Sequence, residues 1–320
     1  MCFKISNDGR GMGENEFGGP WSKDKLNRVE DYISAYLTAM SRQRWCNLVY
    51  IDAFAGSGYQ KLPDSDGDTR SFLGDANAAE TRSFIAGSAM RAIAASENAV
   101  AKGHRGFSRF VFIDKEQATL DTLRDHISSE YPMSLPFCSF ICGDANEKVP
   151  EVVVSQNWTS SRGVAFVDPF SMSIRRSTLD ALSATKSLDV WFLFPLMAVT
   201  RVMERGHEVR PSWSKKLDDM YGGHEWERAI YHEDNQLSLF GDSCMLRRGG
   251  GTDEILRYTT KWLNEIFPQV HESPYILRSA TNSPLFALYA MLSSKSTTAA
   301  KLWKKLVKGV FERKTPYPVD

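Results

Sequence analysis

The sequence contains a glycine-rich motif, DAFAGSG, at residues 52–58, directly after an apolar run. Glycines at such a place let the backbone turn sharply and approach a ligand without a Cβ in the way. In doubly wound folds a nucleotide-like cofactor binds at this point. The motif is neither the G-x-G-x-x-G of nicotinamide-binding folds nor a P-loop, since no G-K-[ST] follows. An ordinary glycine turn is the alternative. The cofactor-binding residues that the motif predicts are Asp52, Phe54, Ala55, Gly56, Ser57 and Gly58.

Two further acidic motifs follow later apolar runs. Asp114 ends the second run, with Lys115 and Glu116 after it. A carboxylate there can accept hydrogen bonds from both hydroxyls of a ribose, and Asp114 is the first choice for this role before Glu116. Asp144 and Ala145 follow the third run, where a carboxylate can accept the exocyclic amine of an adenine ring. Helix capping is the alternative for both aspartates, and at Asp144 the two roles are compatible.

The fourth motif is Asp168-Pro169-Phe170, after the fourth run. Proline fixes its own φ and favours an extended conformation for the residue before it, which limits the freedom of the carboxylate. The aspartate can accept hydrogens from an amino group, and the phenyl ring can stack on a planar acceptor. We therefore predict that Asp168, Pro169 and Phe170 are the catalytic residues, with an Asp-Pro turn as the structural alternative.

These motifs are positioned by runs that are apolar almost throughout rather than alternating, a pattern typical of strands covered on both faces. Stretches compatible with helices separate them. Strand and helix in alternation predict a doubly wound parallel sheet, in which the carboxyl ends of the strands meet at one crevice. The predicted strands are 47–54, 109–114, 137–142, 163–167 and 188–195. The predicted helices are 22–43, 88–102, 115–129, 145–156 and 176–186.

The C-terminal part has a different pattern. Two strand candidates, 275–280 and 285–293, are separated by four residues, which is too short for a crossover helix. They are therefore expected to pair antiparallel. Five parallel strands followed by a terminal hairpin are the layout of the class I methyltransferase fold.

Two long insertions divide the chain. Residues 59–87 are polar and rich in Asp, Gly and Ser, and are expected to form a mobile loop. Residues 197–272 contain helical patterns at 212–221, 224–232 and 252–267 and are expected to cover the carboxyl edge of the sheet. The predicted division is an arm at 1–20, a first part of the core at 21–196, a helical insertion at 197–272 and the completed core at 273–320.

The motifs resemble those of known families. Methyltransferases that act on amino groups of nucleic-acid bases combine D-x-F-x-G-x-G with D-P-P-Y, and this chain has the first motif but reads D-P-F-S in the second. A closer resemblance, over almost the whole chain from Trp21, is to the three-Cys-motif partner protein family. It implies a methyltransferase-like fold that binds a cofactor, and a separate partner protein that carries three cysteines. The matching positions are Lys25, 50–58, Gly87, Ser88, 112–114, 166–170, 191–195 and 283–285.

Composition excludes several classes of protein. Lys+Arg and Asp+Glu are 39 each, so the formal net charge is zero and a surface that is basic throughout is excluded. The most apolar stretch, 190–199, is about half of what a membrane span needs. No signal-peptide pattern is present, and five scattered cysteines and six dispersed histidines offer neither a disulfide framework nor a metal site. We expect a cytoplasmic protein without a metal, and the oligomeric state is left open.

Basic residues suggest where a polyanion would bind. Residues 295–314 carry seven basic side chains against one acidic, with Trp303 and Phe311 among them, and a second group lies at 201–216. The alternative is a solvated amphipathic helix. The substrate-binding residues that this predicts are Arg201, Arg205, Lys304 and Lys305.

Together these features predict a methyltransferase that uses S-adenosyl-L-methionine. Its acceptor would be an amino group of a nucleic-acid base or nucleotide, in RNA or DNA. The alternative is a cofactor-binding or assembly subunit without catalysis, working with a three-Cys-motif partner protein. A nicotinamide oxidoreductase is disfavoured by the glycine motif and by the terminal hairpin.

Overall fold

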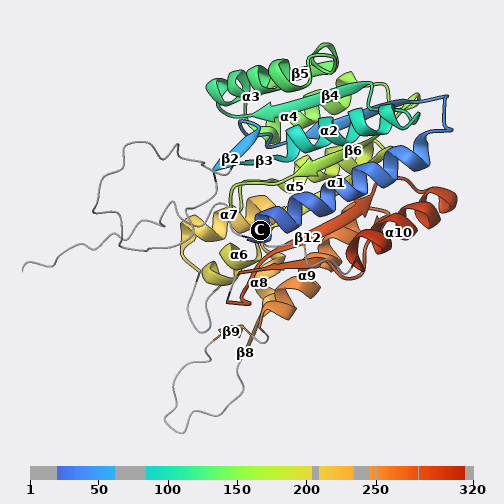
Figure 1. The fold of residues 1–320 in the computed structure, drawn as a ribbon. Coiled ribbons are helices and arrows are strands. Elements are labelled where there is room, and N and C mark those ends of the chain that lie inside the picture. The colour runs from blue at the N-terminus through green and yellow to red at the C-terminus, as the bar shows by residue number, and fades with distance from the viewer. Residues whose placement is uncertain are drawn as a thin grey trace, which may run out of the picture.

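The computed structural model describes residues 20–61, 84–203, 209–233, 246–248, 251–279 and 281–313. A single eight-stranded sheet, in the order β10-β12-β7-β6-β1-β4-β5 with β11 beside β12, forms the centre of this part of the chain (Figure 1). Five of its strands are parallel, as their apolar runs predict. They are β1 (Asn47–Asp52), β4 (Arg109–Asp114), β5 (Cys138–Cys142), β6 (Ser161–Val167) and β7 (Leu188–Phe194).

Helices lie where the sequence predicts them, to within a few residues. Helix α1 (Pro20–Met40) precedes the first strand, and a 3₁₀ turn, η2 (Leu135–Phe137), leads into β5. The helices between the parallel strands are α2 (Ser88–Ala101), α3 (Gln117–Glu130), α4 (Ala145–Ser155) and α5 (Arg176–Ala184).

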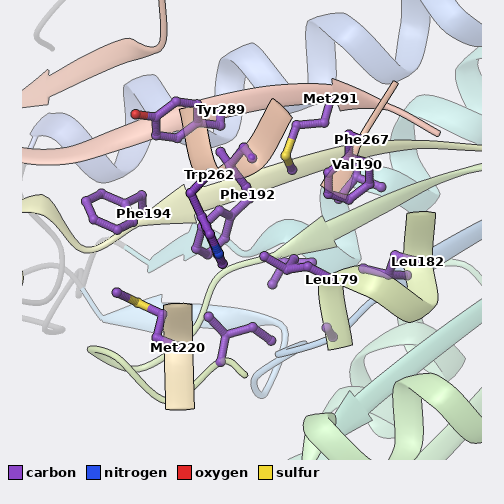
Figure 2. Close-up of a cluster of buried hydrophobic side chains, with 14 of the residues drawn as sticks. Leu179, Leu182, Val190, Phe192, Phe194, Met220, Trp262, Phe267, Tyr289 and Met291 are labelled. Atoms are coloured by element: carbon purple, nitrogen blue, oxygen red, sulfur yellow. The ribbon is translucent and has the colours of Figure 1, made fainter. Parts of the chain in front are cut away.

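Both faces of the sheet are covered, which explains why its strands are apolar throughout. In β7, Val190, Phe192 and Phe194 point to one face, while Trp191 and Leu193 point to the other. Helices α1, α2 and α3 and the C-terminal helix α10 (Thr297–Phe311) cover the second face. Helices α4 and α5 and the four helices between β7 and the terminal hairpin cover the first face. Figure 2 shows Val190, Phe192 and Phe194 of β7 on this face, together with Leu179 and Leu182 of α5.

The sheet ends in an antiparallel hairpin, as predicted. Strand β11 (Tyr275–Arg278) pairs with β12 (Pro284–Leu292), which runs antiparallel to β7. The short β10 (Gln269–Val270) also pairs with β12 and completes this edge. An antiparallel last strand, inserted between the fifth parallel strand and the strands at the edge, is the topology of the class I methyltransferase fold, so the predicted fold class is confirmed.

Between β7 and the hairpin lie α6 (Leu196–Val202), α7 (Pro211–Tyr221), α8 (Glu225–Ile230) and α9 (Thr252–Ile266). The helix expected over 224–232 ends at Ile230, because β8 (Tyr231–Glu233) pairs with β9 (Leu246–Arg248). Helix α6 was not predicted, because it continues the apolar run of β7 without a break. The boundaries of the insertion stay a prediction, and its buried side chains share one apolar cluster with the sheet.

The first insertion begins and ends in a small ladder. Strands β2 (Tyr59–Lys61) and β3 (Phe84–Ala86) pair antiparallel, so the expectation of a loop over 59–87 is wrong at both ends. Residues 62–83, like the arm at 1–19, lie outside the described residues. Among the helices in the described part of the chain, none is both long and apolar enough to cross a bilayer.

A buried polar contact joins helix α1 to strand β7, on the face of the sheet that α1, α2, α3 and α10 cover. The hydroxyl of Tyr32 in α1 donates a short hydrogen bond to Oδ2 of Asp189 in β7, and both side chains are buried. Burial raises the pKa of Asp189 from 3.8 to about 7, and the hydrogen bond from Tyr32 opposes that rise. Burial raises the pKa of Asp52 from 3.8 to about 7 as well. The folded chain therefore holds two protons that the unfolded chain releases near pH 4.

This difference predicts that the free energy of unfolding falls as pH rises from about 4 to about 7, because the folded state binds more protons in that window. Asp189→Asn keeps an acceptor for Tyr32 but does not titrate, so its stability should fall less steeply over the same window. Urea unfolding of both proteins at pH 4, 5.5 and 7 measures the slopes. Equal slopes would contradict the assignment of a titrating carboxyl to Asp189.

Candidate functional site

The carboxyl ends of β1, β4 and β6 bring the first, second and fourth motifs together. Asp52 is in register with Phe112 of β4 and with Phe166 of β6. The turn after β1 continues both ladders, because Ala53 N–H donates to the carbonyl of Phe166 at 3.0 Å and Ala55 N–H to that of Ile113 at 2.9 Å. The glycine motif therefore starts between the ends of two neighbouring strands, at the switch point of the sheet.

Two glycines in this turn have backbone conformations that favour glycine. Gly56 has φ +64° and Gly58 has φ +93°. A Cβ on Gly58 would meet Leu123 at 3.0 Å, so this glycine also serves close packing, whereas a Cβ on Gly56 would have no atom within 4 Å. Gly87 N–H donates to the Gly58 carbonyl at 2.7 Å and fixes the far end of the turn. Gly56 is thus the point where the loop opens onto free space.

Asp114 is tied directly to this turn. Its Oδ2 accepts from Gly56 N–H at 3.1 Å, and its Oδ1 accepts from Glu116 N–H at 2.9 Å. Each carboxylate oxygen can accept a further hydrogen bond, and Asp114 is only partly buried. Lys115 and Glu116 are exposed beside it. A ligand with vicinal hydroxyls can therefore be bound by Asp114 without breaking its contacts to the backbone.

Asp52 lies beneath the turn rather than on its surface. It is fully buried and accepts hydrogen bonds from Phe54 N–H at 3.3 Å and from the hydroxyls of Tyr50 and Ser88. Burial raises its pKa to about 7, and the charge of Asp168 contributes in the same direction. In this conformation Asp52 shapes the loop and has no surface with which to touch a ligand.

Asp144 caps α4, the interpretation that the sequence left open beside ligand binding. Its Oδ1 accepts from the backbone N–H of Asn146 at 2.8 Å and from the amide of the same side chain at 2.9 Å. Ala145 is buried in the first turn of the helix. The carboxylate remains partly exposed, so it can still accept a further donor.

Asn146 was not predicted, and it connects two of the motifs. Its amide donates to the carbonyl of Ser173 at 2.8 Å, and its oxygen accepts from Arg175 N–H and Thr178 Oγ1, each at 2.8 Å. The loop after β6 is thereby fixed to the start of α4. A polar residue in the first turn of a helix carries no sequence signal for such a contact, which spans 27 to 32 residues.

Asp168 forms an ion pair that the motif alone does not show. Lys25 Nζ of α1 lies 2.5 Å from Asp168 Oδ2, with side chains 3% and 23% exposed. Pro169 is buried, while Phe170 is 69% exposed. The sequence does mark Lys25, because a lysine spaced four residues before Val29 and seven before Tyr32 lies on the apolar, buried face of the helix.

A cavity of about 190 Å³ lies between the third and fourth motifs. Helix α7 closes it with Lys216 and Asp219, and Lys216 Nζ is 4.6 Å from the centre of the Trp213 ring. Its lining residues are Asp144, Asn146, Phe170, Ser171, Met172, Ser173, Arg175, Lys216 and Asp219. A larger cavity, of about 530 Å³ between α9 and β11, has none of the predicted residues in its wall. We therefore place the candidate site at the strand ends, where the polar groups converge.

The predicted substrate-binding residues do not form one surface. Arg201 is exposed in the last turn of α6, and Arg205 lies outside the described residues. Lys304 and Lys305 are exposed on α10. This helix follows β12, which runs antiparallel to β7, so it begins at the amino ends of the parallel strands, away from the carboxyl ends that carry the motifs (Figure 1). On that helix the buried side chains are Trp303, Val307 and Val310, and Phe311 packs against Trp191, His271 and Tyr275.

Among the described residues, no group of three or more His, Cys, Asp or Glu side chains is placed to bind a metal ion. The described cysteines, Cys46, Cys138 and Cys142, are free thiols.

Comparisons with known proteins give structural matches only. No family model matches the chain, and no curated protein matches it by sequence. The resemblance to three-Cys-motif partner proteins therefore stays a prediction.

Three proteins of different kinds are among the solved structures that are similar to this chain. Protein LPL1258 from Legionella pneumophila is 13% identical, with a TM-score of 0.42, over 89% of this chain and 92% of that one. Spermidine synthase from Thermotoga maritima is 11% identical, with a TM-score of 0.38, over 92% and 67%. The methyltransferase domain of bacterial CtHen1 is 9% identical, with a TM-score of 0.35, over 83% and 98%.

Asn146→Ala should loosen the loop after β6, because three hydrogen bonds across the site are lost. We expect the protein to lose about 1–3 kcal/mol of stability and the amide of Arg175 to exchange its hydrogen faster. Asn157→Ala is the control, since Thr159, in the same turn, is the one described residue to which the Asn157 side chain bonds. Hydrogen exchange at Arg175 that is as slow as in the wild type would show that Asn146 does not fix this loop.

Proposed function

We propose that this protein is a methyltransferase that uses S-adenosyl-L-methionine. The observation that carries the proposal is the hydrogen bond between Gly56 N–H and Asp114, 3.1 Å long, at the switch point of a class I methyltransferase sheet. It joins a turn that opens onto free space to a carboxylate that can accept two hydroxyls.

The residues at the strand ends fit this cofactor. Asp114 would bind the ribose hydroxyls, and Asp144, in the wall of the 190 Å³ cavity, would accept the adenine amine. The free space at Gly56 would admit the methionine end. When bound, the cofactor supplies a methyl group on a positively charged sulfur.

Asp168 would orient the acceptor. An amino nitrogen of the acceptor would donate a hydrogen bond to the Asp168 carboxylate, which would point the lone pair of that nitrogen toward the methyl group that the cofactor supplies. The proton leaves the nitrogen for solvent afterwards, so no strong base is required and the protein acts chiefly through orientation. Phe170 offers an exposed ring beside this carboxylate.

A nucleotide or nucleic-acid base is the acceptor class that these residues favour. The exposed ring of Phe170 can stack on a base, and the exposed side chains of Arg175 and Lys216, beside the cavity assigned to the adenine, can meet a phosphate on its solvent side. Arg201 on α6 would extend this surface. The lysines of α10 lie away from the strand ends, so we do not include them in it.

One observation favours the alternative, a cofactor-binding or assembly subunit without catalysis. Asp168 already has a partner in Lys25, so one of its oxygens is occupied. A three-Cys-motif protein would be the partner in that case. Transfer of labelled methyl groups from the cofactor to total RNA or to fragmented DNA separates the two functions.

Gly56→Ala should weaken cofactor binding, because a methyl group enters the free space at the turn. An alanine held at the positive φ of this position also costs about 1–2 kcal/mol of stability. Gly103→Ala is a matched control, since Gly103 has φ +77° and no atom within 4 Å of its Cβ position but lies at the end of α2. Calorimetry with S-adenosylmethionine, S-adenosylhomocysteine and NAD measures the effect. We expect at least tenfold weaker binding for Gly56→Ala alone, and no NAD binding. Wild-type protein that binds neither adenosyl ligand at millimolar concentration would contradict the proposal.

Lys216→Ala should weaken binding of a single-stranded RNA or DNA oligonucleotide and reduce the salt dependence of that binding by about one unit of logarithmic slope. Lys102→Ala is the control, because Lys102 is exposed at the C-terminal end of α2 and does not line the cavity. Fluorescence anisotropy between low and physiological salt measures both slopes. Binding that is absent, or that does not respond to salt, would favour a small molecule or a protein as the acceptor.

A further inference from the structure

Lys25 is a charged group at the candidate site that the proposed function does not yet use. Its side chain is 3% exposed, and its ammonium has Asp168 at 2.5 Å and the ring of Trp21 at 5.6 Å. Lysine is almost never this buried unless it is paired. A buried ion pair is weak evidence for a stabilising role, because the loss of hydration offsets most of the attraction between the charges.

Helix α1 does not need this pair in order to dock. Arg28 Nη1 donates to the carbonyl of Val310 at 2.6 Å, and Tyr32 bonds to Asp189. Apolar residues of the same helix fill the core beneath it. They are Leu26, Val29, Ile33 and Leu37. The charge of Lys25 therefore calls for an explanation in what it does to Asp168.

The pair has two consequences for Asp168. It fixes the carboxylate through Oδ2, so Oδ1, which makes no hydrogen bond to a described residue, is left as the acceptor. It also cancels the negative charge of a carboxylate that stands next to the buried carboxyl group of Asp52, at the end of the neighbouring strand. Lys25 can thus set both the direction and the net charge of the site.

We propose that Lys25 is a positioning residue: through its ion pair it orients Asp168 toward the acceptor and neutralises the charge that the cofactor's sulfonium meets. This inference rests on the proposed function. The sulfur of S-adenosylmethionine is positively charged, whereas that of its product, S-adenosylhomocysteine, is neutral. A site whose net charge is altered near the sulfur must therefore change its preference between the two ligands, because the Coulomb energy acts on only one of them.

The test is the ratio of the dissociation constants of the two ligands, measured by calorimetry on the full-length protein. Lys25→Met leaves Asp168 uncompensated and should shift the ratio toward S-adenosylmethionine by roughly fivefold or more. Asp168→Asn leaves the ammonium uncompensated and should shift it the other way. The double variant removes both charges and should return the ratio to within about twofold of the wild-type value. Lys25→Arg keeps the charge and should keep the ratio.

Arg28→Met is the matched control, since it removes a buried cation from the same helix, away from Asp168. It should lower the melting temperature and leave the ratio unchanged. If Lys25→Met does not fold, the opposite shift in Asp168→Asn and its reversal in the double variant carry the same information. A ratio that stays within twofold of wild type in the folded single variants overturns the role of Lys25. Wild-type protein that binds neither ligand overturns the proposed function itself, and that result is obtained before any variant is made.

Discussion

Two carboxyl groups, Asp52 and Asp168, stand at the ends of neighbouring strands, and the repulsion between their charges is the constraint around which the rest of the site is arranged. Two further aspartates, Asp114 at the end of β4 and Asp144 just after β5, lie at the same end of the parallel strands. Each is accommodated differently. Burial leaves Asp52 with a pKa of about 7, backbone N–H groups bond to Asp114, Asp144 caps a helix, and Lys25 pairs with Asp168.

These different arrangements give the four groups different chemistry. Burial raises the pKa of Asp52 to about 7, so this carboxyl group can support the loop from inside with less charge to bury. A carboxylate bonded to backbone N–H groups keeps its remaining lone pairs for hydroxyls, which suits the role proposed for Asp114. An aspartate whose Oδ2 is fixed by a buried ammonium keeps Oδ1, which bonds to no described residue, as an acceptor, and this suits an orienting role at Asp168.

Much of the fold could be predicted because strands buried on both faces are apolar throughout, and because four residues cannot span a crossover between 275–280 and 285–293. The placement of the four motifs then followed from topology alone.

What escaped prediction depends on contacts between distant residues. The pairing of Lys25 with Asp168 joins residues 143 apart, and the contact of Asn146 with Thr178 joins residues 32 apart. Helix α6 escaped because its apolar residues continue those of β7 with no polar break between them. The aromatic residues of the basic C-terminal segment face the core and not a polyanion, because helix α10 needs an apolar face in order to dock and Trp303 is part of that face.

The central claim is that the convergent strand ends form the binding site of S-adenosylmethionine. A crystal structure of the protein grown with S-adenosylhomocysteine tests it most directly. The account predicts the ribose hydroxyls on Asp114, the adenine ring toward Asp144 and the thioether sulfur on the side of Asp168. Ligand density in the cavity between α9 and β11, or a nucleoside that makes no contact with Asp114, would contradict it.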